Sequence, residues 1–247
     1  MRTILGEAVT QAVKQLFLSA CRMPERGALA AIESALKKET SAPAKEALRQ
    51  LVENARIARQ TGMPYCQDTG MAVVFVELGQ DVRIEGNLSE AIHEGVRQAY
   101  EEGYFRKSVR DPLTGQNTGD NTPAVIHYDV VPGDKLRITA APKGFGSENM
   151  SRIAMLKPSD GLGGIRRFIL DSVRIADGSP CPPVVLGVGI GGTFELCALL
   201  AKKQLLRPIG SVNADETLAR MERELRDDIN ALGIGALGLG GPNYCLA

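Results

Sequence analysis

The feature that most constrains the fold is the apolar run MAVVFVEL at residues 71–78, which only Glu77 interrupts. Its β-branched residues and the glycine before it are typical of a buried strand. Before this run, apolar side chains recur at helical spacing from Ile4 to Phe17, and residues 27–39 and 43–60 continue the pattern. We therefore expect a helical lobe over about residues 1–61, followed by a sheet.

Further strands and helices should complete an α+β fold, in which helices flank a mixed β-sheet. In the helix expected at 88–103, Ser89 is a plausible cap and Gly103 a plausible stop. No repeat or flexible linker divides the chain, so a single domain over residues 1–247 is expected. The other predicted elements are strands at 81–86, 124–131 and 135–140, helices at 163–178 and 214–231, and a strand, glycine turn and helix within 182–206.

The charge pattern argues against nucleic acid and membrane as partners. Lys plus Arg and Asp plus Glu both number 29, and neither sign forms a long block. No stretch approaches the roughly 20 apolar residues of a membrane span. The first apolar run is interrupted by Glu7, Gln11 and Lys14, unlike a signal peptide, so we expect a cytoplasmic location.

The five cysteines are widely and irregularly spaced, which is unlike a disulfide framework. Cys66 and Cys181 each stand at a loop-to-strand junction beside proline or glycine, where a side chain can face a cleft. Cys21, near a helix end, and Cys197, within a helix, are more typical of buried hydrophobic residues. On spacing alone, Cys66 and Cys181 could be metal ligands, a disulfide, or neither.

Two glycine-rich segments could each hold an anion at the start of a helix. Gly187, Gly189 and Gly192 formally satisfy G-x-G-x-x-G, but the acidic strand end that a dinucleotide fold requires is missing. A tight turn with close packing explains these glycines equally well. In the second segment, residues 142–151, Lys143 adds charge, and Ser147 or Asn149 could cap the residues after it.

Basic residues precede an Asn- and Gly-rich turn between two strands. Arg106, Lys107 and Arg110 could bind carboxylates through paired hydrogen bonds, which suits a dicarboxylic acid, although a basic surface turn is the ordinary explanation. His93 and His127 lack the spacing of a zinc motif, and a structural role is the common one for a strand histidine such as His127.

Five motifs, PYCQDTG, NTGDNTPAVIH, KGFGSEN, SPCPPVVLGVGIGGTFE and GALGLGG, occur in an order that resembles the N-terminal domain of class I fumarases. The resemblance covers about residues 5–241 and is closest to the separate alpha subunit of two-subunit fumarate hydratases and tartrate dehydratases. It implies a hydro-lyase with a [4Fe-4S] cluster that three cysteines hold, leaving one iron open to substrate. Such an iron acts as a Lewis acid.

The resemblance also assigns roles to individual residues. Cys66 and Cys181 match two cluster ligands. Gln67, Asp68 and Arg106 would bind the dicarboxylic substrate, and Asp68 would be the catalytic acid that protonates the leaving hydroxyl. Gly144 or Gly146 would offer backbone amides to the substrate.

The remaining catalytic groups of the family lie in its C-terminal domain, a separate beta subunit in the split enzymes. The resemblance thus implies a beta subunit as partner, activity only in its presence, and a higher hetero-oligomer. The third cysteine ligand is expected beyond residue 247, because Cys245 matches no ligand of the family. We accordingly expect the sequence to be truncated at its C-terminus.

Reversible hydration of fumarate to malate is the leading functional hypothesis, with dehydration of L-tartrate as the closest alternative. No residue decides between these substrates, which differ by one hydroxyl. A hypothesis of another class is a metal-free binding or assembly subunit, for which Cys66 and Cys181 would be dispensable. An electron-transfer iron–sulfur protein is disfavoured because no C-x-x-C spacing is present.

Overall fold

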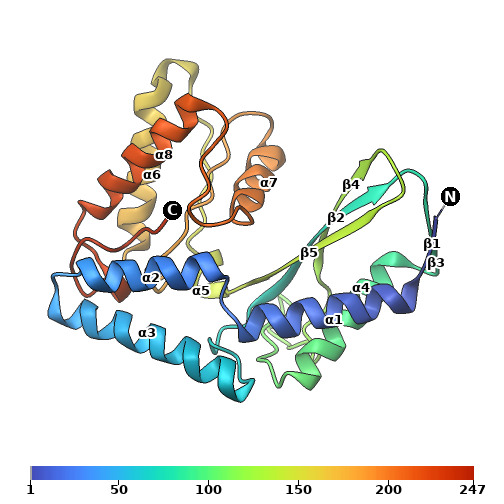
Figure 1. Ribbon diagram of the computed structural model, residues 1–247. Helices are drawn as coiled ribbons and strands as arrows, with labels where there is room; N and C mark the ends of the chain where they lie inside the picture. Colours follow the sequence, from blue (N-terminus) through green and yellow to red (C-terminus); the bar gives the residue numbers. More distant parts are fainter. Residues whose placement is uncertain (1) are drawn as a thin grey trace. The chain divides into compact units, whose positions relative to one another are not determined.

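The computed structural model of the protein describes residues 2–247, with the Arg26 side chain excepted (Figure 1). The chain divides into two compact units. Unit 1 comprises Met1–Pro24 and Ala55–Phe145, and unit 2 comprises Glu25–Asn54 and Gly146–Ala247. One boundary between them falls within helix α3 (Ala42–Thr61), and the others follow Pro24 and Phe145. The predicted α+β class is confirmed, and the single domain expected over residues 1–247 stays a prediction.

Unit 1 is built on a three-stranded mixed sheet with the order β4-β2-β5. The central strand β2 (Met71–Gly79) pairs in parallel with β4 (Val125–Val131) and antiparallel with β5 (Leu136–Lys143). In this register Phe75 lies between His127 and Thr139. The apolar run of the sequence is therefore the central strand, as its hydrophobicity predicts.

Helices α1 (Gly6–Arg22) and α4 (Leu88–Glu102) lie side by side against one face of this sheet (Figure 1). They approach closely because Gly95 has no side chain: a Cβ there would lie 2.6 Å from the Thr10 carbonyl oxygen. The Thr10 hydroxyl donates a buried hydrogen bond of 2.9 Å to the Ala91 carbonyl. Their apolar faces and alternate β2 residues form the core of the unit, with Val13, Phe17, Val74, Ile92, Val96 and Tyr100 at its centre.

Two local predictions in unit 1 are wrong. Ile4 belongs to a strand, β1 (Arg2–Leu5), which pairs in parallel with β3 (Val82–Glu85). Pairing between strands so far apart in the sequence leaves no local signal, and a short apolar run fits the periodicity of a helix as well as that of a strand. The cap of α4 is Asn87, whose side chain accepts from the Glu90 amide at 3.2 Å, whereas the Ser89 hydroxyl bonds to the Tyr128 hydroxyl at 2.8 Å. Gly103 is the C-cap as predicted.

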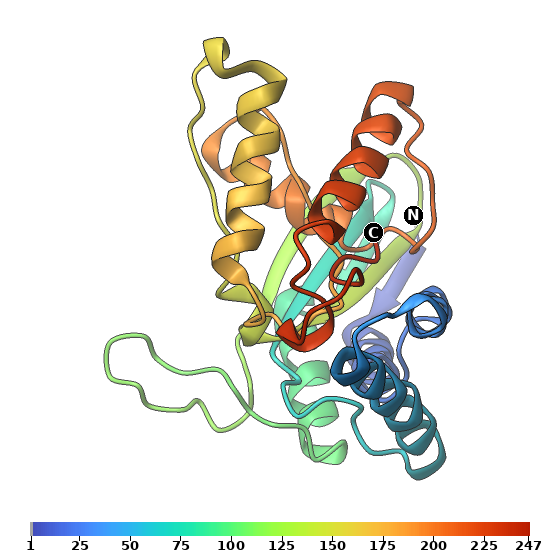
Figure 2. The same ribbon diagram turned by 90° about the vertical axis from the view of Figure 1, so that its left-hand side faces the viewer.

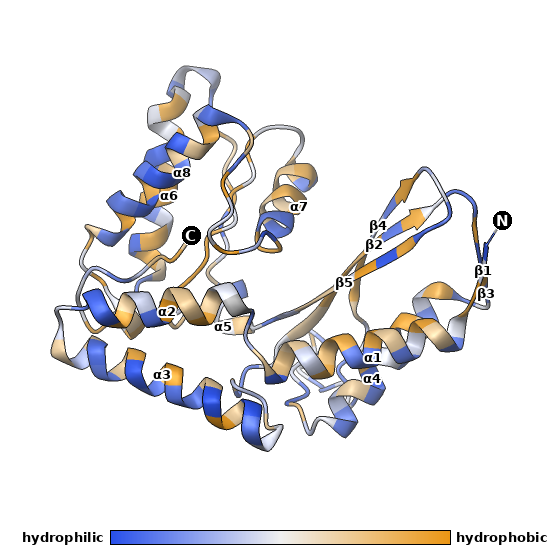
Figure 3. Cartoon of the chain, viewed as in Figure 1, coloured by the Kyte–Doolittle hydropathy of each residue, from blue (hydrophilic) through white to orange (hydrophobic). Residues whose placement is uncertain are grey.

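Unit 2 is mainly helical. Helices α6 (Gly161–Ala176) and α8 (Glu216–Asn230) pack through Ile169, Val173, Leu225 and Ile229. Helix α2 (Arg26–Lys38) and the first part of α3 form a smaller apolar cluster with Ala236. In Figure 3 hydrophilic and hydrophobic residues alternate along α3 and α8, as in amphipathic helices. The remaining elements of the unit are α5 (Phe145–Glu148), which begins at the boundary, α7 (Phe194–Gln204), and the short 3-10 turns Pro158–Asp160 and Ala236–Gly238.

Among the described residues of unit 2, the strand predicted after residue 182 is absent. Helices α7 and α8 follow as expected. Val184 does form an isolated parallel bridge with Cys245, and the amides of Val184 and Leu186 donate to the Tyr244 and Ala247 carbonyls at 2.9 Å each. Beyond them, a Cβ on Gly187 or Gly189 would collide with carbonyl oxygens of α7. The backbone at Gly187 and Gly189 packs directly against α7, the helix that follows it, and this packing prevents it from continuing as a strand.

No helix among the described residues combines the length and apolar character needed to cross a bilayer.

Candidate functional site

Cys66 lies on an irregular segment of unit 1 between α3 and β2. Its thiol is free and exposed. The segment meets the end of α1, since the Tyr65 amide donates a hydrogen bond of 3.1 Å to the Cys21 carbonyl. Gln67 is exposed beside Cys66, and Asp68 is half-buried. We call residues 65–70 the cysteine loop.

Three hydrogen bonds from side chains fix the far end of the cysteine loop. The buried Tyr100 hydroxyl donates to the Thr69 carbonyl at 2.7 Å, and Asn121 Nδ2 donates to the Gly70 carbonyl at 3.0 Å. The Thr69 hydroxyl in turn donates to the Arg106 carbonyl at 2.9 Å. The loop that carries Cys66 is thereby connected to the segment that carries Arg106.

Asn121 connects these segments, although it is remote from both in sequence. It is fully buried and has a φ of 63°, a region that asparagine tolerates better than most residues. Its Oδ1 accepts hydrogen bonds from the amides of Ser108, at 2.7 Å, and Val109, at 3.1 Å. One side chain thus satisfies buried backbone groups on both sides of the site.

The carboxylate of Asp68 lies against the backbone of Gly144, at the end of β5. A Cβ on Gly144 would be 3.0 Å from Asp68 Oδ2, tighter than an ordinary contact. One residue after Thr69, Gly70 has a φ of 63°, and a Cβ there would collide with the Lys143 carbonyl oxygen. Unit 1 therefore brings together five of the residues predicted from the sequence, namely Cys66, Gln67, Asp68, Arg106 and Gly144.

The end of α1 adds charge and burial beside the cysteine loop. Burial raises the pKa of the Cys21 thiol to about 12, with the nearby Arg22 charge opposing the rise and the Cys66 thiolate adding to it. Desolvation also raises the pKa of Tyr65. Cys21 is buried, as predicted, and stays protonated at neutral pH, whereas Cys66 is open to solvent.

Cys181 lies in unit 2, on a turn after α6 rather than before a strand. Its thiol is free and exposed, and its φ of 57° places it in the left-handed region. The Cys181 amide donates to the Gly178 carbonyl at 3.1 Å, and the Leu237 amide donates to the Pro182 carbonyl at 2.8 Å. Backbone hydrogen bonds thus hold this turn to the GALGLGG segment.

Gly146 also belongs to unit 2, within α5. The cap predicted at Ser147 or Asn149 is wrong, because this single-turn helix already begins at Phe145. The Lys202 ammonium of α7 contacts both oxygens of Glu148, at 2.6 Å for Oε1. The pair ties α5 to α7.

The G-x-G-x-x-G pattern serves packing. Gly187 and Gly189 face the backbone of α7, where any Cβ would collide. Of the readings open from sequence, the tight turn with close packing is the one that the structure supports at these two positions.

The histidines of unit 1 have structural contacts. His93 Nδ1 accepts from the Ala124 amide at 3.2 Å, and His127 stacks on Phe75 with ring centroids 5.0 Å apart. In unit 2, Cys197 is only half-buried, so its predicted burial is wrong in degree. Its thiol donates to the Phe194 carbonyl, a contact that a helix near the surface permits.

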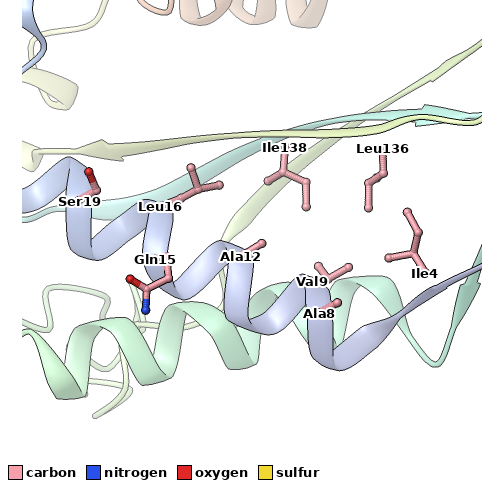
Figure 4. Close-up of a pocket in the computed structure, with 9 residues that line it drawn as sticks. All are labelled: Ile4, Ala8, Val9, Ala12, Gln15, Leu16, Ser19, Leu136 and Ile138. Atoms are coloured by element: carbon pink, nitrogen blue, oxygen red, sulfur yellow. The ribbon is translucent and has the colours of Figure 1, made fainter.

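A groove of about 470 Å³ lies between α1 and β5 in unit 1 (Figure 4). Its lining is mainly apolar, with Ile4, Val9, Leu136 and Ile138 among the contributors. None of the predicted site residues lines it, so the groove is separate from the cysteine loop.

An iron–sulfur cluster requires thiolate ligands, and the chemistry of Cys66 and Cys181 fits that requirement. Both thiols are free, exposed and carried on irregular backbone, unlike the buried Cys21 and Cys245. Among the described residues, no three Cys, His, Asp or Glu side chains come together as a metal site. The chain thus offers two suitable ligands from different units.

Sequence reasoning missed Tyr100, Asn121 and Arg22. Asn121 lies inside a motif that carries the resemblance, but its side-chain partners are set by tertiary structure. An asparagine before Thr-Pro in a turn was the available signal. Nothing local marks Tyr100 or Arg22, since each occupies an ordinary position of an amphipathic helix.

Comparison with known proteins gives a consistent result. The model of the family described as fumarate hydratase (Fumerase) matches residues 10–247. A Methanocaldococcus jannaschii protein named as a candidate L(+)-tartrate dehydratase subunit alpha is 44% identical over 240 residues, covering 94% of this chain and 84% of that protein. The L(+)-tartrate dehydratase subunit alpha of Escherichia coli strain K12 is 33% identical over 208 residues, covering 82% and 68%.

The family match spans nearly the whole chain, and it includes every residue that the structure gathers around the cysteine loop. Both relatives carry the name of an enzyme that removes water from its substrate. The resemblance seen in the sequence motifs is confirmed: the chain belongs to the fumarate hydratase (Fumerase) family of hydro-lyases.

Proposed function

We propose that this chain is the alpha subunit of an iron–sulfur hydro-lyase that removes water from L(+)-tartrate. The observation that carries the proposal is the arrangement in unit 1, where Asp68 lies against Gly144 and the same loop is bonded to the Arg106 segment. The substrate follows the relatives, which are named for L(+)-tartrate. This choice reverses the order of the sequence hypotheses, in which fumarate came first.

Cys66 and Cys181 would hold a [4Fe-4S] cluster together with a third cysteine from outside residues 1–247. When bound, such a cluster with one open iron supplies a Lewis acid for the hydroxyl and a carboxylate of a 2-hydroxy diacid. Both thiols are exposed, so ligation would require little rearrangement of side chains around them.

The chain's own residues would bind and orient the diacid. Arg106 has an exposed side chain next to a carbonyl fixed by Thr69, and its guanidinium can pair with a carboxylate through two parallel hydrogen bonds. Gln67 adds an exposed amide, which can donate to a substrate oxygen. Gly144 and Gly146 would offer backbone amides to the substrate, because neither has a side chain that would cover them.

Asp68 would move the proton. A carboxylic acid at Oδ1 or Oδ2 can protonate the departing hydroxyl, which then leaves as water while a base takes the proton from the neighbouring carbon. For tartrate the product is an enol that converts to a 2-oxo diacid. Gly144 leaves room for the Asp68 carboxyl group, because a Cβ there would lie 3.0 Å from Oδ2, and general acid catalysis would depend on that room.

The base is expected in a beta subunit, and we propose that activity requires that partner. The relatives are named as alpha subunits, which supports a second kind of subunit. A higher hetero-oligomer and a cytoplasmic location belong to the same proposal.

Hydration of fumarate to malate is the second candidate, because the family model is described by that activity. The two substrates differ by one hydroxyl on the carbon that loses its proton. A site that hydrogen-bonds this hydroxyl would reject malate strongly, whereas a site that merely tolerates it would accept both.

The test is a comparison of kcat/KM for L(+)-tartrate, D-tartrate and malate, using the anaerobically purified complex of alpha and beta subunits. The proposal expects L(+)-tartrate to be preferred over malate by about 10⁴-fold or more, the scale at which a site built to hydrogen-bond a hydroxyl rejects the analogue that lacks it. A preference for malate would establish the second candidate. Absence of turnover with all three, in a complex that binds them, would favour the non-catalytic binding subunit.

A further inference from the structure

Glu39 is a buried carboxylate of unit 2 that the proposed mechanism does not use. It directly follows α2 and is only 5% exposed. Burying a charged group is costly unless hydrogen bonds replace its water. Oε1 accepts from the amides of Thr40 and Ser41, at 2.8 Å each, and Oε2 accepts from Asn243 Nδ2 at 2.8 Å. One oxygen thus serves the turn before α3, and the other binds a residue 204 positions away.

Capping of α3 alone does not explain a buried glutamate. The residues preferred at the start of a helix are Ser, Thr, Asp and Asn, and Ser41 already occupies the position before α3. Glu39 adds contact with residues 239–243. A Cβ on Gly241, the last glycine of GALGLGG, would overlap Glu39 Oε1, so this glycine makes room for the carboxylate. The Ser41 hydroxyl adds a hydrogen bond of 2.9 Å to the Leu239 carbonyl.

The segment that Glu39 holds is bonded to the backbone around Cys181. The Leu237 amide donates to the Pro182 carbonyl at 2.8 Å, and the Val184 amide donates to the Tyr244 carbonyl at 2.9 Å. A Cβ on Gly178 would lie 3.3 Å from Gly238 Cα, which shows how closely the two segments pack. Main-chain groups therefore hold the Cys181 turn to residues 237–244, and a side chain, Glu39, holds those residues to the turn between α2 and α3.

A ligand on an exposed turn depends on such support. Cys181 lies on irregular backbone with a φ of 57°, and its thiol is exposed. Groups outside the ligand set orient the ligands of a metal site, and a ligand has to be held within about 0.5 Å of its productive position. The nearest buried charged group that fixes the neighbouring segment is the Glu39 carboxylate.

We propose that Glu39 is a positioning residue for the Cys181 thiol, which it keeps in place through the GALGLGG segment and Asn243. This proposal rests on the proposed function for the role of Cys181 as a cluster ligand. Glu39 acts through Gly241 and Asn243 and not on iron or substrate. It also gives a reason for the buried carboxylate and for the glycine that faces it.

The experiment uses the assembled complex of alpha and beta subunits, first without the cluster and then with it. Glu39→Met keeps a side chain of similar length and removes the carboxylate. Asn243→Ala removes only the bond to Oε2 and leaves the amides of Thr40 and Ser41 paired. Glu33→Gln, at an exposed glutamate of α2, is the matched control for charge.

Hydrogen exchange, followed by mass spectrometry, reports on the Cys181 turn in the cluster-free complex. We expect peptides covering 178–186 and 235–241 to exchange about 10- to 100-fold faster in Glu39→Met, the effect of losing hydrogen bonds to a charged group. In Asn243→Ala the increase should be about 10-fold. Peptides of α8 should exchange as in the parent, because its core contacts with α6 are unchanged. A merely structural role would speed exchange throughout unit 2.

The second readout is the rate at which an iron chelator removes iron from the cluster-containing complex under anaerobic conditions. A ligand on a less fixed turn leaves its iron more readily, so iron loss should be about 10-fold faster in Glu39→Met and in Asn243→Ala than in the parent. Glu33→Gln should match the parent in both readouts.

Parental exchange at 178–186 in Glu39→Met would overturn the proposal, and so would faster exchange that extends equally to α8. Faster exchange at the turn with an unchanged rate of iron loss would also overturn it, because the turn would then not limit the cluster. If Glu39→Met fails to fold, parental exchange in Asn243→Ala would overturn the proposal by itself. A parent complex without iron would refute the proposed function, whereas hydrogen exchange would still show whether Glu39 holds the Cys181 turn.

Discussion

The cysteine loop of unit 1 and the Cys181 turn of unit 2 present the same group, an exposed free thiol, by different means. Buried side chains hold the first: Tyr100 and Asn121 bind its carbonyls. Main-chain hydrogen bonds and glycine contacts hold the second, through Gly178 and the Pro182 carbonyl. One substitution that the backbone tolerates removes the hydrogen bonds that a side chain makes, which we call a side-chain tether. The hydrogen bonds between main-chain groups, a backbone tether, are disturbed only when an added atom displaces the chain.

The largest effect is expected from removing the Asn121 side chain, which bonds both to the cysteine loop and to the segment that follows Arg106. Asn121→Gly tolerates the φ of 63° but deletes three hydrogen bonds to buried backbone groups. We expect the free energy of unfolding to fall by about 3 kcal/mol, measured by urea denaturation. Asn117→Ala, in the exposed loop of residues 103–120 (Figure 2), should cost less than about 1 kcal/mol. Equal losses would show that Asn121 is not a special tether.

Gly144→Ala separates the position of Asp68 from the stability of the fold. The added Cβ would lie 3.0 Å from Asp68 Oδ2 and should displace the carboxyl group. We expect kcat of the assembled enzyme to fall by about 10- to 100-fold while KM changes less, because a misplaced acid acts mainly on the chemical step. Gly163→Ala, where no atom lies within 4 Å, is the control. A wild-type kcat in Gly144→Ala would argue against Asp68 as the acid.

Gly178→Ala probes the backbone tether of the second site. Its Cβ would come within 3.3 Å of Gly238 Cα, so the Cys181 turn and the GALGLGG segment must shift by a few tenths of an ångström. We expect a loss of about 1–2 kcal/mol in the free energy of unfolding, smaller than for Asn121→Gly. If Gly178→Ala proves the more damaging of the two, the contrast between side-chain and backbone tethers is wrong.

The smallest expected effect concerns the reactivity of the cysteine thiols. Burial raises the pKa of Cys21 to about 12 and that of Cys245 to about 11, so both remain thiols below pH 10. Since thiolates are the reactive form, iodoacetamide at pH 8 should label Cys66 and Cys181 in the native, cluster-free chain and spare Cys21 and Cys245. Mass spectrometry of the digest identifies the labelled sites. Labelling of Cys21 at the rate of Cys66 would contradict the burial of the Cys21 thiol.

The sequence was informative where local pattern and tertiary structure agree. The run MAVVFVEL predicts the central strand because a strand buried on both faces is largely apolar, and the helices at 88–103, 163–178 and 214–231 follow from their periodicity. It failed where distant backbone decides the conformation. Ile4 pairs with Ile84, and Gly187 and Gly189 pack on α7, neither of which a local window can detect.

For the site, the motif resemblance indicated which residues to examine, and the structure shows how unit 1 holds five of them. Asp68 next to Gly144, or Thr69 bonded to the Arg106 carbonyl, depends on side chains brought together by folding. The proposed choice of tartrate over malate could not be read from any residue, because one hydroxyl separates these two substrates.

Iron and acid-labile sulfide per chain test the central claim most directly, namely that the two thiols serve one cluster. The measurement compares the anaerobically assembled complex of alpha and beta subunits with Cys66→Ser, Cys181→Ser and, as control, Cys197→Ser of α7. The account predicts about four irons in the parent and in Cys197→Ser, and a clear loss in both other variants. Full iron in either Cys66→Ser or Cys181→Ser, or none in the parent, would contradict it.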